Sequence, residues 1–250
     1  MLRYRGEVVA SETVLREALE LAAARGDRWA EVQARRGLAR LAAQWENWEG
    51  AKEHLTAALQ ASLAGGDAAT LADLYIELSD VLVQLGDASS AESELWEGLM
   101  LVTHGDGPEA ERGPEPLWRM LWALGELARA AGDLPGARSY GLHALRHAAR
   151  VDSPVGRGRA HTFLAEVNDM LGDAQEAIEQ RRLAVEELRR VGDRRTTAEL
   201  LILLADPETG SAASAVEAKA WLKEADALAA EIGWQEGVDR SRAQLARLPS

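Results

Sequence analysis

Small residues recur at fixed offsets along this chain, within segments whose apolar positions follow the period of amphipathic helices. With Ala177 as the reference, equivalent small residues return at intervals of about 40 residues. They are Ser11, Ala51, Ala91, Ala137 and Ala218. Each is followed seven positions later by Ala or Gly, on the same helical face, where small side chains let a neighbouring helix approach closely. The pattern predicts a stacked array of helical repeats.

A second helical segment precedes most of the reference residues and pairs a large residue with a small one, as in Leu78-Ser79 and Leu164-Ala165. Gly-Asp dipeptides separate many of the segments. They are Gly26-Asp27, Gly66-Asp67, Gly86-Asp87, Gly132-Asp133, Gly172-Asp173 and Gly192-Asp193. We expect Gly to take the left-handed conformation that closes one helix, and Asp to accept hydrogen bonds from the N–H groups that open the next. Asp173 with Glu176 also fits a capping box.

The predicted fold class is all-α, built from antiparallel helical hairpins. The expected helices are 8–25, 28–45, 48–64, 68–85, 88–103, 116–131, 134–150, 155–171, 174–191, 194–205, 213–232 and 235–247. We divide a single domain, 1–250, into a half repeat 1–27, repeats 28–67, 68–115, 116–154, 155–193 and 194–233, and a C-terminal capping helix 234–250. The prolines and glycines of 104–116 predict a surface loop, and Pro207 should shorten the helix before it.

The hairpin pattern resembles the tetratricopeptide repeat (TPR) family. Leu164-Ala165, Leu171-Gly172, Ala177 and Ala184 match that family's large–small pair, turn glycine and second-helix alanines, and nearly the whole chain follows the same plan. The period of about 40 rather than about 34 residues resembles the family's longer variants, as in arrays of bacterial signalling and regulatory proteins. The resemblance implies a right-handed superhelix, an α-solenoid, whose concave groove is lined by the first helices and binds a peptide or protein.

Projection of the first helices predicts which side chains line that groove. They are Gln33, Arg36, Arg40 and Gln44; Asp73, Glu77, Asp80 and Gln84; Arg119, Trp122, Glu126 and Arg129; and Arg159, Phe163, Glu166 and Asp169. The partner-binding candidates among them are Arg36, Arg40, Asp73, Glu77, Asp80, Arg119, Trp122, Glu126, Arg159 and Glu166. None of the groove positions is Lys or Asn, so the family's Lys/Asn clamp for C-terminal carboxylates is not supported.

Composition narrows the classes of partner. The formal net charge is −13, which opposes direct binding to nucleic acid or to an anionic membrane surface. The chain has no Cys, and its longest apolar run, 200–205, is far too short to span a bilayer. We therefore expect a cytoplasmic protein whose partner is a protein or a peptide.

Catalytic and cofactor motifs are weak. His143 and His147 have a spacing that can hold zinc, but no Glu follows the first His, so two ordinary histidines are favoured. No Lys stands in a nucleotide-binding P-loop, and carboxylate pairs such as Glu186-Glu187 are explained by solvated helix faces. We expect no enzyme activity, no cofactor and no metal site.

The eight tryptophans are the most distinctive side chains. Most should pack between helices, namely Trp29, Trp45, Trp48, Trp96, Trp118, Trp221 and Trp234. Trp122 projects into the expected groove, where an aromatic side chain can anchor a ligand.

Two functions are favoured, and a third, a small-molecule or metal enzyme, has the least support. The first is a non-catalytic protein–protein interaction scaffold. The alternative is the regulatory or sensor segment of a larger bacterial signalling protein, such as a kinase, an NTPase or a transcription regulator. It is suggested because the copy at Ser11 has only a second helix, whose partner would precede Met1. The N-terminal helix, with Val8, Val9 and Leu15 partly uncovered, could equally drive homodimerisation.

Overall fold

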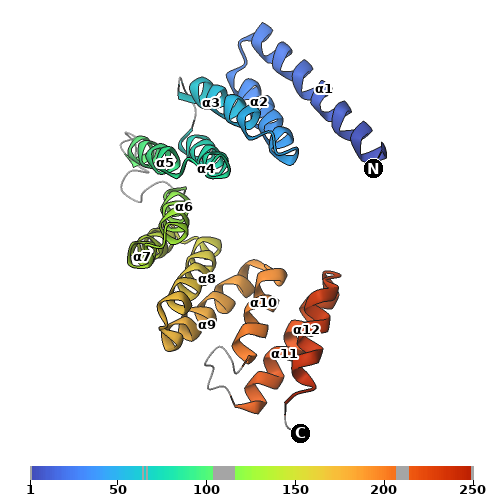
Figure 1. Cartoon of the computed structure of the whole chain (residues 1–250), viewed down its shortest axis with the longest axis vertical. Helices are drawn as coiled ribbons and strands as arrows, with labels where there is room; N and C mark the ends of the chain where they lie inside the picture. The colour runs from blue at the N-terminus through green and yellow to red at the C-terminus, as the bar shows by residue number, and fades with distance from the viewer. Residues whose placement is uncertain (1, 64, 66, 104–115, 207–213, 249–250) are drawn as a thin grey trace. The chain divides into compact units, whose positions relative to one another are not determined.

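The computed structural model describes residues 2–63, 65, 67–103, 116–206 and 214–248, and side chains from Ser11 onward. The loop expected at 104–116 lies outside this part except for Pro116, and so do Pro207 and the side chains of Val8 and Val9. In the described residues every regular element is an α-helix (Figure 1). The helices are α1 Leu2–Arg25, α2 Arg28–Gln44, α3 Trp48–Leu63, α4 Ala68–Gln84, α5 Ala88–Thr103, α6 Leu117–Ala130, α7 Leu134–Arg150, α8 Pro154–Leu171, α9 Ala174–Val191, α10 Arg194–Ala205, α11 Ala215–Glu231 and α12 Gln235–Leu245.

The predicted helices α2 to α12 are confirmed within two residues at each end. Helix α10 ends at Ala205, as the Pro207 signal predicted. Helix α1 differs, because it begins at Leu2 rather than near residue 8. No proline interrupts it, and the one glycine in its first turns, Gly6, weakens a helix by only about 1 kcal/mol.

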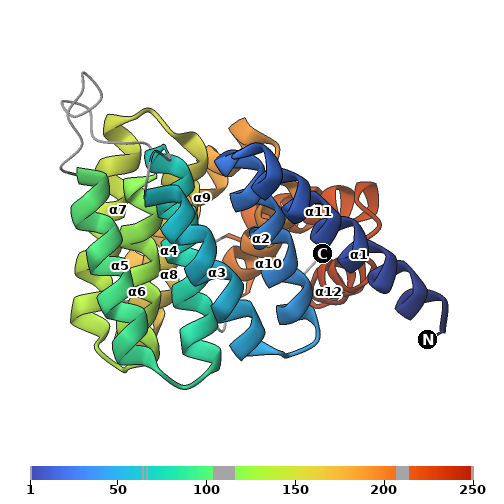
Figure 2. The ribbon, with the colours of Figure 1, turned by 90° about the horizontal axis from the view of Figure 1, so that it is seen from above.

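Neighbours in sequence are neighbours in space. Helices α2 and α3, α4 and α5, and α8 and α9 pack as pairs, each joined by a connection of two or three residues (Figures 1 and 2). Such short connections turn the chain back on itself, so the paired helices run antiparallel. The chain forms two compact units, Met1–Ala123 and Leu124–Ser250. The division into repeats stays a prediction.

The Gly-Asp breaks act as the sequence predicted at most positions. Gly26, Gly86, Gly132, Gly172 and Gly192 all have φ between 66° and 82°. Five aspartates cap the following helix by accepting a hydrogen bond from a backbone N–H three residues on. They are Asp27, Asp67, Asp87, Asp133 and Asp193.

The capping box predicted at Asp173 and Glu176 is wrong. The Asp173 side chain makes no capping hydrogen bond, because its carboxylate instead accepts one from Arg138 Nη1 at 3.3 Å. The Glu176 carboxylate accepts from Gln180 Nε2 at 2.8 Å. A capping box does open α11, where Ser214 and Glu217 bond to each other's backbone N–H.

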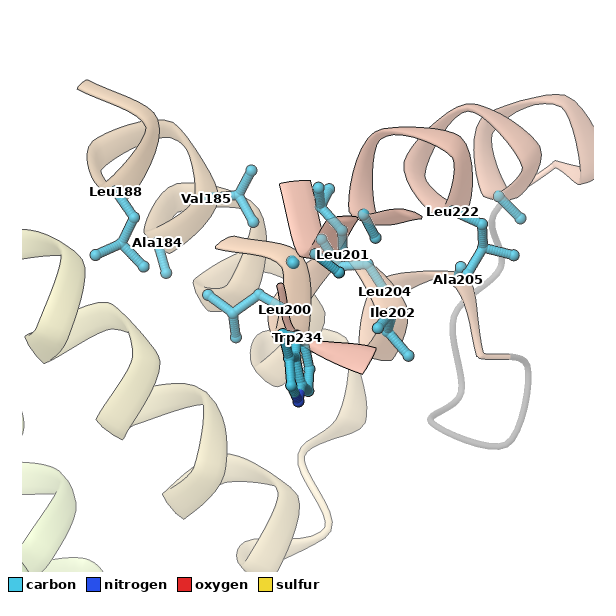
Figure 3. Packing of buried hydrophobic residues seen from close by; sticks show 14 of the residues in the cluster. Ala184, Val185, Leu188, Leu200, Leu201, Ile202, Leu204, Ala205, Leu222 and Trp234 are labelled. Carbon is cyan, nitrogen blue, oxygen red and sulfur yellow. The ribbon is translucent and has the colours of Figure 1, made fainter. Parts of the chain in front are cut away.

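The core of each unit depends on small residues where helices meet. In the first unit Ala51, Ala58 and Ala91 are fully buried. Gly98 is another close contact, because a Cβ there would lie 2.5 Å from the Tyr75 ring. In the second unit a hydrophobic cluster joins α9 to α12, with side chains such as Leu201, Leu222 and Trp234 gathered around α10 (Figure 3).

Candidate binding surface on the first helices

Five of the predicted binding residues meet in one charge network in the first unit. Arg36 of α2 donates from Nη2 to Glu77 Oε1 at 2.8 Å and to Asp73 Oδ2 at 3.2 Å, both on α4. Arg40, one turn further along α2, donates to the same Glu77 oxygen at 2.6 Å. Arg119 of α6 pairs with Asp73 from the other side. We call Arg36, Arg40, Asp73, Glu77 and Arg119 the first-helix charge network.

The network forms because α2 and α4 each carry two like charges at one-turn spacing. Arg36 and Arg40 are four residues apart, as are Asp73 and Glu77, so each pair lies along one face of its helix. The neighbouring first helix presents charges of the opposite sign. The change of sign from one repeat to the next, visible in the sequence, therefore joins adjacent repeats through their side chains.

The interactions within the network keep both its acidic and its basic side chains ionised. Burial works to raise the pKa of Glu77, but hydrogen bonds and charge from Arg36 and Arg40 outweigh it and hold that pKa below its usual value. The pKa of Arg36 is raised, chiefly by its hydrogen bond to Glu77 and against the effect of burial. Both groups are therefore charged near neutral pH.

The other two candidates of the first unit border this network. Asp80, exposed, follows Glu77 on α4 by three residues. Trp122 follows Arg119 on α6 by three residues and is half-buried, whereas Trp118 is fully buried. Trp122 is thus partly accessible one turn from a charged residue.

The candidates of the second unit are placed differently. Glu126 accepts hydrogen bonds from Arg129 within α6, and Arg159 of α8 is exposed. Glu166 of α8 is exposed as a residue, yet its pKa is raised, first because neighbouring groups exclude water from the carboxyl. Arg129 lowers that pKa in part and Glu126 raises it, so these three side chains interact.

The groove assignment of Phe163 is wrong. Its side chain is 2% exposed and packs in the core of the second unit. Two glycines make the room, since a Cβ at Gly125 or at Gly141 would lie 2.9 Å from the Phe163 ring. The glycine at position 141, where other repeats carry leucine, was the sequence signal for this packing.

Arg181 of α9 also stands where other repeats carry leucine. The residue is 3% exposed, and Nη2 pairs with Asp169 of α8. Nη1 is buried without a hydrogen-bond partner in the described part of the chain. Asp169, predicted to line the groove, is therefore engaged by a buried cation from the second helix.

Three tryptophans expected to pack between helices are exposed instead. Trp29, Trp45 and Trp96 each keep more than two fifths of their surface accessible. Trp29 lines an open cavity of about 370 Å³ together with Val32 and Thr70. These residues lie at or near helix ends or on outer faces, where a periodic pattern does not distinguish a covered position from an open one.

The two histidines at zinc-binding spacing differ in environment. His143 is exposed, whereas His147 is half-buried, and its Nδ1 has no hydrogen-bond partner within the described residues. Burial and the nearby arginines Arg150 and Arg146 lower the pKa of His147. In the described part of the chain, no three His or carboxylate side chains gather as a metal site would need, and no helix is long and apolar enough to cross a membrane.

Solved structures give the comparison with known proteins. BtubC from P. vanneervenii superposes with a TM-score of 0.66 at 15% identity, over 96% of this chain and 91% of that one. A STAND signal transduction ATPase from Pyrococcus horikoshii, which has a tetratricopeptide repeat sensor, gives 0.61 at 16% identity, over 88% and 37%. A Rap conjugation gene regulator in complex with a Phr peptide gives 0.58 at 13% identity, over 86% and 58%.

The chain has a TPR-like fold. At these identities the likeness establishes the TPR-like architecture alone. No family model and no curated protein sequence matches the chain. Its length corresponds to nearly all of BtubC but to less than two thirds of the Rap regulator and of the STAND protein.

Proposed function

We propose that this chain is a non-catalytic scaffold that binds a protein or peptide partner through its first helices. The observation that supports this most is the first-helix charge network, which gathers side chains from α2, α4 and α6. A surface drawn from three successive repeats can follow an extended segment, which is how repeat arrays build binding surfaces. Trp122 beside it adds an apolar contact.

The chemistry of the network favours recognition over catalysis. A general acid or base works best when its pKa lies near the operating pH. The pKa of Glu77 is lowered and that of Arg36 is raised, so both move away from neutrality. Groups that stay charged near neutral pH can orient a partner, but they do not exchange protons with it.

The structural neighbours support the same proposal. The Rap regulator was solved with a Phr peptide, and the STAND protein carries its TPR array as a sensor. By analogy we propose a cytoplasmic protein whose partner is a protein or peptide, with no direct contact to nucleic acid or membrane. A homodimer through α1 is a further proposal, since Val14 and Leu21 are exposed on that helix.

The alternative is a regulatory or sensor segment of a larger signalling protein. It is favoured by the STAND protein, of which this chain covers 37%. Sequencing the native reading frame upstream tests it. A kinase, NTPase or DNA-binding domain there would favour the alternative, and an upstream stop codon would contradict it.

A pull-down from the source lysate, read by mass spectrometry, tests the scaffold. We expect a partner that wild type captures and that Trp122→Ala combined with Arg119→Glu loses. The matched control is Trp96→Ala combined with Arg16→Glu, which changes an exposed aromatic and an exposed arginine on the second helices α5 and α1. The control should keep the partner. Equal recovery by all three proteins would contradict binding through the first helices.

A further inference from the structure

The first-helix charge network is layered. The side chains of Asp73 and Glu77 are each 24% exposed, and that of Arg36 only 12%. Arg40 and Arg119 are more open, at 65% and 37%. The carboxylates therefore lie beneath guanidinium groups, and an approaching molecule meets Arg40 and Arg119 first.

The two outer arginines have donors to spare. A guanidinium carries five N–H donors in a rigid plane. Among the described residues the guanidinium of Arg40 hydrogen-bonds only to Glu77, and that of Arg119 only to Asp73. The carboxylates beneath hold each plane in place, which lowers the entropy cost of pairing with a second carboxylate from outside.

The positions of the charged side chains, rather than the sum of their charges, decide which sign of charge this surface prefers in a partner. Three arginines and two carboxylates leave the network with an excess of one positive charge, which Asp80 next to it cancels. Asp80 lies beyond Glu77 along α4, so it bounds the surface at that end. The most exposed side chains of the network, Arg40 and Arg119, are donors, and the half-buried Trp122 lies one turn from Arg119.

We infer that this surface selects an acidic segment of a protein partner, whose Asp or Glu carboxylates pair with Arg40 and Arg119. The inference rests on the proposed scaffold function and names its partner class. Carboxylates match the planar donors of arginine in a bidentate way, and an apolar residue of the segment would cover Trp122. Basic segments are disfavoured because they would meet two guanidinium groups.

Selection from a library of displayed random decapeptides, with immobilised full-length protein, tests the inference. The chain carries a charge of −13, so non-specific attraction would enrich basic peptides. We expect wild type to enrich peptides rich in Asp and Glu instead. Arg40→Gln combined with Arg119→Gln should abolish that enrichment and weaken binding of the best synthetic peptide by tenfold or more. The control, Arg189→Gln combined with Arg190→Gln on α9, should leave both unchanged.

The outcomes separate this inference from the function on which it rests. Enrichment of basic or neutral peptides, equal binding after every Glu of the peptide is replaced by Gln, or no enrichment at all would each overturn the acidic preference. Retained affinity in the Arg40→Gln, Arg119→Gln variant would do the same, provided that circular dichroism shows an unchanged fold. If one of these outcomes overturns the acidic preference but Trp122→Ala combined with Arg119→Glu still loses the lysate partner, the scaffold function stands without the acidic preference.

Discussion

At the scale of single residues, the turns between helices show how one backbone requirement is met by different side chains. Five Gly-Asp turns place glycine in the left-handed region, and Gly233 does so before α12. Two turns use other residues, Glu46 with φ 57° before Asn47 and Asp152 with φ 50° before Ser153. Asn47 and Ser153 still cap their helices. The geometry of the turn is therefore kept at a cost in backbone strain.

Glu46→Gly should raise the free energy of unfolding by about 1 kcal/mol. A non-glycine residue in the left-handed region destabilises the folded state by roughly 1–2 kcal/mol, and glycine removes this strain. The greater freedom of glycine in the unfolded chain offsets about half of that stabilisation. Glu46 is exposed, so little else changes. Urea unfolding measures the effect. Glu46→Ala, which keeps the strain, should give no increase, and an equal increase for both would contradict the explanation.

At the scale of elements, the α8–α9 hairpin contains a group of buried polar side chains, His161, Asn168, Gln180 and Arg181. His161 Nδ1 lies 2.7 Å from Gln180 Oε1, and both residues are 9% exposed. Arg181 is buried with one unpartnered nitrogen, and Asn168 is buried with an unpartnered Oδ1. A hairpin with such a core gives up stability, because a buried polar atom without a partner costs roughly 1–3 kcal/mol.

Arg181→Leu and Asp169→Asn should change stability in opposite directions. Leucine is the residue that most other repeats carry at this position, and it removes a buried donor that has no partner. The Asp169 side chain that loses its ion pair is 38% exposed, so water can solvate it. We therefore expect the free energy of unfolding to rise by about 1 kcal/mol. Asparagine leaves the guanidinium buried without its carboxylate, so we expect a loss of about 2 kcal/mol. Thermal unfolding of both variants measures these changes in stability. A loss of stability for Arg181→Leu would show that the ion pair stabilises the hairpin.

At the scale of the whole molecule, each unit has a core of its own. The cluster of the second unit runs from Ile178 to Val238 and ties α9, α10, α11 and α12 together. Arg195 covers the Trp234 ring at 3.8 Å from its centroid, which adds a cation–π contact at the edge of that cluster. In repeat proteins stability is close to a sum over neighbouring repeats, so a unit with a continuous core can fold without the rest.

A fragment of residues 133–250 should therefore fold cooperatively. It keeps the Asp133 cap, the helices α7 to α12 and the entire cluster. Far-ultraviolet circular dichroism should show a helical spectrum that melts in one transition. Leu201→Ala within the fragment should lower its free energy of unfolding by about 2–5 kcal/mol, because Leu201 is fully buried. A fragment without helical signal would mean that the helices α7 to α12 need residues that precede Asp133.

The sequence alone determined the helices, the boundaries of α2 to α12 and the helical hairpin. These features depend on local chemistry, since a helix is ended by a glycine such as Gly86 and opened by a cap such as Asp87 close to it in the chain. The small residues at fixed offsets also predicted correctly where helices meet, as Ala91 and Gly98 show. Period and capping are properties of a few neighbouring residues, so they can be read along the chain.

Only the tertiary structure decided what the candidate side chains contact. Projection of α8 placed Phe163 outward, but Gly125 and Gly141 on other helices leave the space that buries it. Charges that change sign between first helices are visible in the sequence, but the pairing of Arg36 with Asp73 and Glu77 is seen only in the structure. The same holds for Arg119 on the other side of Asp73. Such contacts depend on how successive hairpins stack, and stacking is set by side chains on several helices together.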